Sequence, residues 1–125
     1  MSRKGIAIMK KILLVEDEKT LCLLYEEELG KAGYAVKAVY DADAALEELG
    51  RGKYDLIITD IRMPGKNGIE LITQIMGLRK DIPIIINSAY QSYKDDFMTW
   101  AADAYVVKSS SLDELKRKIK DLIGD

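Results

Sequence analysis

Five short apolar runs alternate with helical patterns along the chain, and this alternation constrains the fold more than any other feature. The runs are Ile12–Val15, Ala35–Val39, Leu56–Ile58, Ile82–Ile86 and Ala104–Val107. Three of them are nearly continuous in Ile, Leu and Val, which is typical of strands that helices cover on both faces. The alternation therefore predicts an α/β fold, a doubly wound (βα)5 chain with a parallel five-stranded sheet and helices on both faces.

The segments between the runs carry helix signals. Capping residues mark the expected starts of three helices, namely Asp41, Asn67 with Glu70, and Ser111 with Glu114. The first helix is expected to share one apolar face among Leu21, Leu24, Tyr25 and Leu29. A further helix, the fourth, is expected around Tyr93, Phe97, Trp100 and Ala101. The run over residues 35–39 is the most polar, so we expect it to be an edge strand.

Length and composition narrow the class of protein. A chain of 125 residues predicts a single domain, which we place at residues 11–125 after an N-terminal extension at residues 1–10. The net charge of −2 argues against direct contact with nucleic acid, and no apolar run is long enough to span a membrane. The single cysteine, Cys22, cannot form an internal disulfide, which fits a cytoplasmic protein. The absence of histidine excludes His-based acid–base catalysis and catalytic triads.

Polar side chains follow four of the five expected strands, at the carboxyl ends where proteins of this class build their sites. They are Glu16 with Asp17, Asp60, Ser88 and Lys108. Carboxylates gathered at one rim repel each other unless a cation lies among them. Asp17 and Asp60 suit Mg²⁺ or Mn²⁺, which prefer oxygen ligands. Lys108 can hold Asp60 or an incoming oxyanion, to which Ser88 can donate a hydrogen bond.

Each of these residues also has a plainer interpretation. Glu16 and Asp17 can be charges that stabilise a helix N-terminus, Ser88 can begin a turn, and Lys108 can point to water. Asp60 is harder to explain in this way, because a carboxylate directly after an apolar strand is costly to bury without a partner. An acid, a hydroxyl and a lysine on successive strand ends together favour a functional site.

The same residues carry a resemblance to a known family. The matching segments are Leu14–Glu18, Ile58–Pro64 with Gly68, Ile86–Ala89 and Tyr105–Lys108. Spacings of 43, 28 and 20 residues separate Asp17, Asp60, Ser88 and Lys108. In these features the chain resembles, over Lys11–Gly124, the receiver domain of two-component response regulators, including the single-domain chemotaxis and sporulation regulators. The resemblance implies a flavodoxin-like strand order of 2-1-3-4-5.

The resemblance also implies an acceptor and a metal site. Asp60 would be the phosphoacceptor, whose carboxylate attacks the phosphorus of a phosphohistidine on a histidine kinase. Asp60, Asp17, Glu16 and the backbone carbonyl of Arg62 would hold Mg²⁺ or Mn²⁺.

A switch is implied at the neighbouring strand ends. Ser88 would bond the phosphoryl group, Lys108 would pair with it, and Tyr105 would turn inward when Ser88 moves. The family usually has proline after this lysine, whereas Ser109 follows Lys108 here. Because a cis bond without proline costs ~2.5–4 kcal/mol, we predict a trans Lys108–Ser109 bond. The long stem of Lys108 should still reach Asp60.

The function expected from the resemblance is a phosphorylation-switched signalling module. Its donor would be a histidine kinase or a phosphotransfer protein. Phosphorylation would switch the surface of the fourth helix, fifth strand and fifth helix toward a downstream protein target or a missing output domain. We expect a cytoplasmic monomer or weak dimer, with no nucleic-acid or membrane partner. The protein would not be an enzyme beyond catalysing its own phosphorylation and dephosphorylation.

Three other functions fit the same fold. A receiver-like interaction domain without phosphorylation would be favoured by loss of an acid, of the acceptor or of the lysine, and all are present. A flavodoxin-like electron carrier needs a phosphate-cradling loop where the acidic segment Glu16–Lys19 stands. A phosphatase with an aspartate nucleophile needs a second Asp where Arg62 stands.

Overall fold

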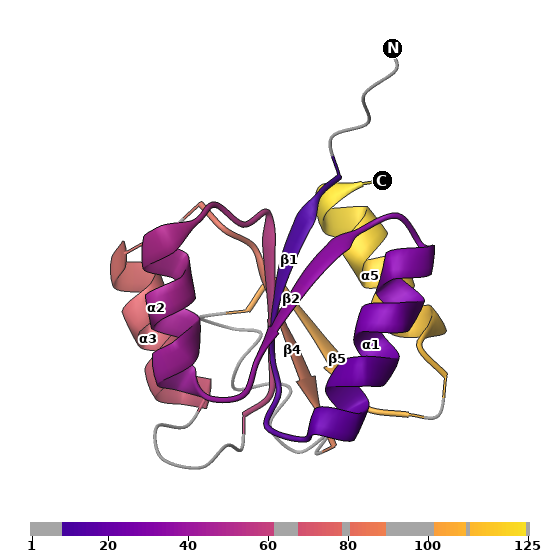
Figure 1. Cartoon of the computed structure of the whole chain (residues 1–125), viewed down its shortest axis with the longest axis horizontal. Helices are drawn as coiled ribbons and strands as arrows, with labels where there is room; N and C mark the ends of the chain where they lie inside the picture. Colours follow the sequence, from indigo (N-terminus) through magenta and orange to yellow (C-terminus); the bar gives the residue numbers. More distant parts are fainter. Residues whose placement is uncertain (1–8, 62–67, 79–80, 90–101, 110, 125) are drawn as a thin grey trace.

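The sheet has the predicted architecture (Figure 1). The computed structural model describes residues 9–61, 68–78, 81–89, 102–109 and 111–124. Its elements are β1 (Lys11–Val15), α1 (Lys19–Lys31), β2 (Ala35–Val39), α2 (Ala42–Arg51), β3 (Leu56–Thr59), α3 (Gly68–Leu78), β4 (Ile84–Ser88), β5 (Ala104–Val107) and α5 (Asp113–Ile123). All strands pair in parallel in the order β2-β1-β3-β4-β5, which confirms the fold and the edge position of β2. The helix expected around residues 93–101 lies outside the described residues.

Helices cover both faces of the sheet, α2 and α3 on one side and α1 and α5 on the other (Figure 1). Successive residues of a strand point to opposite faces, so each strand supplies both layers. In β1, Leu13 and Val15 pack in the cluster with α2 and α3, whereas Ile12 and Leu14 pack in the cluster with α1 and α5. None of the described helices has the length and hydrophobicity to cross a membrane.

The buried face of α1 differs in part from the prediction. Tyr25 and Leu29 are buried as expected, together with Cys22, whereas Leu24 is 44% exposed. Cys22, Tyr25 and Leu29 are spaced by three and four residues, which places them on one stripe of the helix. Leu24 lies about 100° around the helix from Tyr25, so it cannot share that stripe. The helix ends at Lys31 with Ala32 as its capping residue, and the next residue, Gly33, has a φ of 101°, the left-handed conformation that glycine favours.

Strand β4 is shifted two residues toward the carboxyl end from its predicted position. The apolar run begins at Ile82, but Pro83 has no N–H group with which to join the ladder, so the strand starts at Ile84. At its other end Asn87 and Ser88 pair with β5 and belong to the strand. The shift places two polar, buried side chains at the end of β4.

Two of the predicted helix caps lie among the described residues, and only one of them is confirmed. Asp41 caps α2 as predicted, because its Oδ1 atom accepts a hydrogen bond from the backbone N–H of Ala44 at 2.7 Å. The predicted capping box of Ser111 and Glu114 is wrong, since α5 begins at Asp113 and Leu112 is the capping residue. Ser111 lies one residue too early for that role, and its Oγ accepts from the N–H of Asp113 at 3.2 Å.

Candidate functional site

The carboxyl ends of the strands bring the expected residues to one rim of the sheet. Glu16 follows β1, Asp60 follows β3, Ser88 ends β4 and Lys108 follows β5. Two backbone hydrogen bonds tie neighbouring strand ends together. Asp60 N donates to Val15 O at 3.3 Å, and Lys108 N donates to Ser88 O at 2.7 Å. The parallel pairing thus fixes the relative positions of the side chains that leave these ends.

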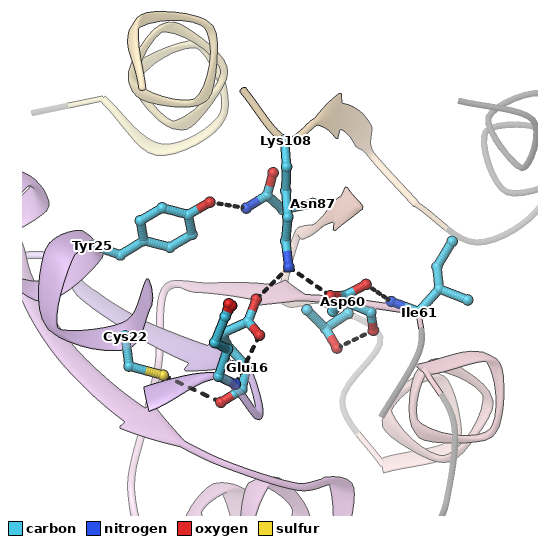
Figure 2. Close-up of polar contacts among 9 residues, drawn as sticks. Glu16, Cys22, Tyr25, Asp60, Ile61, Asn87 and Lys108 are labelled. Atoms are coloured by element: carbon cyan, nitrogen blue, oxygen red, sulfur yellow. Dashed lines mark hydrogen bonds and ion pairs between the residues drawn. The ribbon is translucent and has the colours of Figure 1, made fainter. Parts of the chain in front are cut away.

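The ammonium group of Lys108 bridges two carboxylates that come from different strands (Figure 2). Its Nζ atom lies 2.6 Å from Glu16 Oε1 and 2.7 Å from Asp60 Oδ2. Both acids are buried and the Lys108 side chain is only 17% exposed. Charges in such a setting lose most of their hydration, so each depends on its partners to remain charged.

Backbone N–H groups hold the second oxygen of each buried acid. Glu18 N donates to Glu16 Oε2 at 3.0 Å, and Ile61 N donates to Asp60 Oδ1 at 2.6 Å. Each carboxylate therefore presents one oxygen to a backbone donor and the other to Lys108, which fixes its orientation. The Cys22 thiol adds a hydrogen bond at 3.2 Å to the carbonyl oxygen of Glu16, which ties the start of this loop to α1.

Burial and ion pairing shift the protonation equilibria of this cluster. Burial raises the pKa of Glu16 above its ordinary value, and the hydrogen bonds from Lys108 and Glu18 offset this only in part. Burial alone would lower the pKa of Lys108, but its hydrogen bonds with Asp60 and Glu16 outweigh that effect and raise it. Lys108 is therefore a permanent positive charge at neutral pH, held between the two acids.

Three carboxylates form a cluster that fits a divalent cation. Glu16, Asp17 and Asp60 each offer an oxygen atom, and these atoms lie within 4.8 Å of one another. Asp17 is exposed while the other two acids are buried, so the cluster opens to solvent on the Asp17 side. Its donor set consists of oxygen atoms alone, which Mg²⁺ and Mn²⁺ prefer. Arg62, whose backbone carbonyl was expected to complete the ligands, lies outside the described residues.

Ser88 and Tyr105 are both buried near the rim. Ser88 is fully buried at the end of β4, and Tyr105 is 5% exposed. Tyr105 is paired with Ile86 across the ladder and packs in the cluster formed with α2 and α3. The Lys108–Ser109 bond is trans, as predicted. No peptide bond among the described residues is cis.

A buried polar pair next to these residues was not predicted from the sequence. Asn87 Nδ2 donates to the hydroxyl oxygen of Tyr25 at 2.9 Å, across 62 positions of the chain. Figure 2 shows the Tyr25 ring reaching from α1 toward the Asn87 amide. The sequence signal for a polar residue here is the interruption of the apolar run at Asn87. This signal does not identify the hydrogen-bond partner, because Tyr25 was assigned only to an apolar helix face.

Comparison with protein families gives a match over most of the chain. The model of the response regulator receiver domain matches residues 12–120. Two curated relatives are similar at about one third identity. The two-component response regulator PhoP of Pseudomonas aeruginosa is 35% identical over 115 residues, which cover 90% of this chain and 51% of PhoP. The response regulator ArlR of Staphylococcus saprophyticus is 37% identical over 117 residues, which cover 92% of this chain and 53% of ArlR. The chain thus spans about half the length of these curated relatives.

Solved structures match over almost their whole length. The response regulator TrrA of Thermotoga maritima, crystallised with Mg²⁺ and BeF, has a TM-score of 0.86 and 46% identity, covering 91% of this chain and 99% of TrrA. TrrA in complex with the histidine kinase ThkA has a TM-score of 0.85 and 45% identity, covering 92% of this chain and 99% of the matched chain.

Proposed function

The chain belongs to the family of response regulator receiver domains, and on that basis we propose that it is a phosphoacceptor signalling module. It takes a phosphoryl group from the phosphohistidine of a histidine kinase onto Asp60 in a Mg²⁺-dependent reaction. The observation that carries this proposal is the ammonium group of Lys108 between Glu16 and Asp60, beside the exposed Asp17. A phosphoacceptor module needs an acceptor carboxylate and a positively charged group close to each other.

The geometry of Asp60 suits a nucleophile. Phosphoryl transfer asks the protein mainly for positioning and for neutralisation of charge. Ile61 N and Lys108 Nζ hold the two carboxylate oxygens of Asp60 at 2.6 and 2.7 Å. One of these oxygens attacks the phosphorus, the P–N bond to the donor imidazole breaks, and the imidazole nitrogen keeps the electron pair. Lys108 is then placed to pair with a phosphoryl oxygen.

Glu16, Asp17 and Asp60 are the residues we propose as holders of Mg²⁺ or Mn²⁺, with the backbone carbonyl of Arg62 as a further ligand. Their oxygen atoms within 4.8 Å of one another support this assignment. When bound, the ion supplies positive charge to the phosphoryl oxygens. Asp17 provides the solvent-facing side of the cluster, through which an ion can enter.

Ser88 and Tyr105 are proposed as the residues that register phosphorylation. An acyl phosphate adds negative charge and three acceptor oxygens at the rim, so a hydroxyl at the neighbouring strand end gains a hydrogen-bond partner. Ser88 stands at the end of β4, next to β5. Tyr105 lies on β5 beside Ile86 and is expected to repack when Ser88 moves. The affected surface would comprise β5, α5 and the segment between β4 and β5.

The proposed partners follow from the relatives. TrrA has been crystallised with a histidine kinase, which supports a kinase or phosphotransfer protein as the donor for this chain. The curated relatives are about twice as long as the matched region, which supports a downstream protein target or an output domain as the receiver of the signal. We place the receiver domain at residues 11–125 after an extension at residues 1–10. We further propose a cytoplasmic monomer or weak dimer that catalyses only its own phosphorylation and dephosphorylation.

Metal-dependent phosphorylation by a small phosphodonor tests this function. The protein is incubated with phosphoramidate in Mg²⁺ or in EDTA, and its intact mass is followed over time. We expect uptake of a phosphoryl group in Mg²⁺ and none in EDTA, and phosphotransfer from some members of a panel of purified histidine kinases. Absence of uptake in Mg²⁺ would contradict the proposal and favour an interaction domain that is not phosphorylated.

A further inference from the structure

Tyr25 and Asn87 form a buried polar pair where α1 packs on the sheet, within electrostatic range of Lys108, Glu16 and Asp60. Tyr25 is 2% exposed and Asn87 is 3% exposed. The residues of the sheet that pack on the same face include Leu14, Ile58 and Val106. Polar groups are costly to bury, and replacing both members of a hydrogen-bonded pair by apolar groups of similar shape can be neutral for stability. Stability of the core alone therefore does not account for a tyrosine hydroxyl and an amide at this place.

The pair is attached directly to two of the site residues. Asn87 precedes Ser88 in β4 and pairs with Val106, two residues before Lys108. The backbone N–H of Lys108 donates to Ser88 O at 2.7 Å. Figure 2 shows the Tyr25 ring and the Asn87 amide on the Glu16 side of the Lys108 stem in this view. A displacement of Asn87 would therefore move Ser88 and, through this backbone hydrogen bond, the backbone from which the Lys108 side chain leaves.

The other end of the pair is anchored in α1, which contacts the site a second time. Tyr25 lies three residues after Cys22, and the Cys22 thiol donates to the carbonyl oxygen of Glu16. Among the described residues, the Tyr25–Asn87 hydrogen bond is the one such bond that either side chain makes. A hydrogen bond has a direction, which apolar packing lacks, so it fixes the rotation of the Asn87 amide.

We propose that the Tyr25–Asn87 hydrogen bond is a positioning device of the phosphoryl-transfer site, which holds Lys108 and Ser88 in place and so sets the rate of transfer to Asp60. This inference rests on the proposed function. Tyr25 and Asn87 act here as positioning residues, because neither touches Asp60. Small displacements of positioned groups are known to slow a reaction strongly without a change in the reacting groups themselves.

The test compares three single substitutions in the full chain. Tyr25→Phe removes the hydroxyl, Asn87→Leu removes the amide, and Tyr34→Phe is the matched control. Tyr34 is also a buried tyrosine of the same cluster, and its hydroxyl donates to Gly124 O at 2.8 Å, in contact with the end of α5. The initial rate of phosphorylation is measured against phosphoramidate concentration at saturating Mg²⁺. Mg²⁺ affinity and the midpoint of urea unfolding are measured for each variant.

We expect Tyr25→Phe and Asn87→Leu each to lower the maximal rate by about three- to tenfold, with the half-saturating donor concentration and the Mg²⁺ affinity unchanged. The double variant should be no slower than the slower single variant, because both substitutions break one interaction. Tyr34→Phe should react at the rate of the parent. If Tyr25→Phe does not fold, the same criteria apply to Asn87→Leu.

Two results would overturn the inference while leaving the proposed function intact. One is a parent rate in both Tyr25→Phe and Asn87→Leu. The other is an equal loss of rate in Tyr34→Phe, which would trace the effect to stability of the shared cluster. A parent protein that takes up no phosphoryl group would instead contradict the proposed function, and this inference with it.

Discussion

The Nζ atom of Lys108 lies 2.7 Å from Asp60 Oδ2, although the two residues are 48 positions apart and leave strands that are not neighbours. The lysine reaches over the end of β4, which separates β3 from β5. It is therefore the residue following β5 that supplies positive charge to the carboxylate following β3. The same ammonium group also contacts Glu16 after β1, so it links the ends of three strands.

Replacement of Lys108 should show how much the clustering of Glu16 and Asp60 destabilises the folded state. We expect Lys108→Met to lower the free energy of unfolding by about 3 kcal/mol in EDTA, because one partner of a buried ion cluster is lost. Mg²⁺ should recover part of the loss, since an ion that binds only the folded state stabilises it. Urea unfolding with and without Mg²⁺ measures both effects.

The matched control is Lys116→Met. Lys116 pairs with Glu28 at 3.2 Å across the surface between α5 and α1, away from the three acids. Ion pairs that solvent reaches contribute little, so this variant should be close to the parent in either buffer. An equal loss in both variants, or no effect of Mg²⁺ on Lys108→Met, would contradict the role given to Lys108.

Phosphorylation should change hydrogen exchange around Ser88 and Tyr105. The reason is that Ser88 ends the strand next to β3, Tyr105 lies on β5 beside Ile86, and both are expected to repack around the added charge. Exchange is compared for the free protein and for the protein with Mg²⁺ and beryllofluoride, a stable phosphoryl mimic. We expect changes in β4, β5 and α5. Changes restricted to β2 and α2 would count against the switch.

Cys22 should make stability depend on pH in the alkaline range. Burial raises the pKa of its thiol from an ordinary value of 9.0 to about 11, and the carboxylates of Glu16, Glu26 and Asp17 add to the shift. Between these values the folded state binds more protons than the unfolded state, so the free energy of unfolding falls as pH rises. The contribution is fully present below pH 9.0 and is lost as pH rises through about 11.

Urea unfolding of the parent and of Cys22→Ala between pH 8 and pH 11 measures this contribution. The other groups titrate in both proteins, so the difference between the two curves isolates the thiol. We expect a shallower decline for Cys22→Ala, even though its stability at neutral pH is lower because of the cavity left by sulfur. Parallel curves would show that the thiol is not buried as described.

The helix caps should differ in their effect on stability. Asp41→Ala removes a side-chain bond to the first turn of α2 and should cost about 1 kcal/mol. Ser111→Ala should cost less, because Ser111 precedes the capping residue of α5. Thermal unfolding of the two variants gives the order, and a larger loss for Ser111→Ala would support the capping box that the structure lacks.

The sequence predicts the fold well because parallel strands covered on both faces are continuous apolar runs. The prediction fails at β4, where hydrophobicity includes Ile82 but the missing N–H of Pro83 sets the first residue of the strand. It also fails for Leu24, since an apolar residue near a buried stripe of a helix need not belong to it. Both errors are limited to one or two residues and leave the topology unchanged.

The sequence predicts which residues reach the site but not all the contacts of their side chains. Parallel pairing brings Asp60, Ser88 and Lys108 to one rim, whichever direction their side chains take. The contact of Lys108 with Glu16 was not predicted, because it depends on the direction in which a long side chain leaves the strand. The Tyr25–Asn87 pair depends on how α1 sits on the sheet, which local patterns do not determine.

The identity of the acceptor is the central claim, and intact mass after incubation with phosphoramidate and Mg²⁺ tests it most directly. The variants are Asp60→Asn and, as a control from the other end of β3, Asp55→Asn. Asp55 accepts a hydrogen bond from Lys11 N at 2.8 Å and lies at the opposite rim. We predict that the parent and Asp55→Asn gain a phosphoryl group, whereas Asp60→Asn remains folded and gains none. Phosphate incorporation in Asp60→Asn equal to that of the parent would contradict the account.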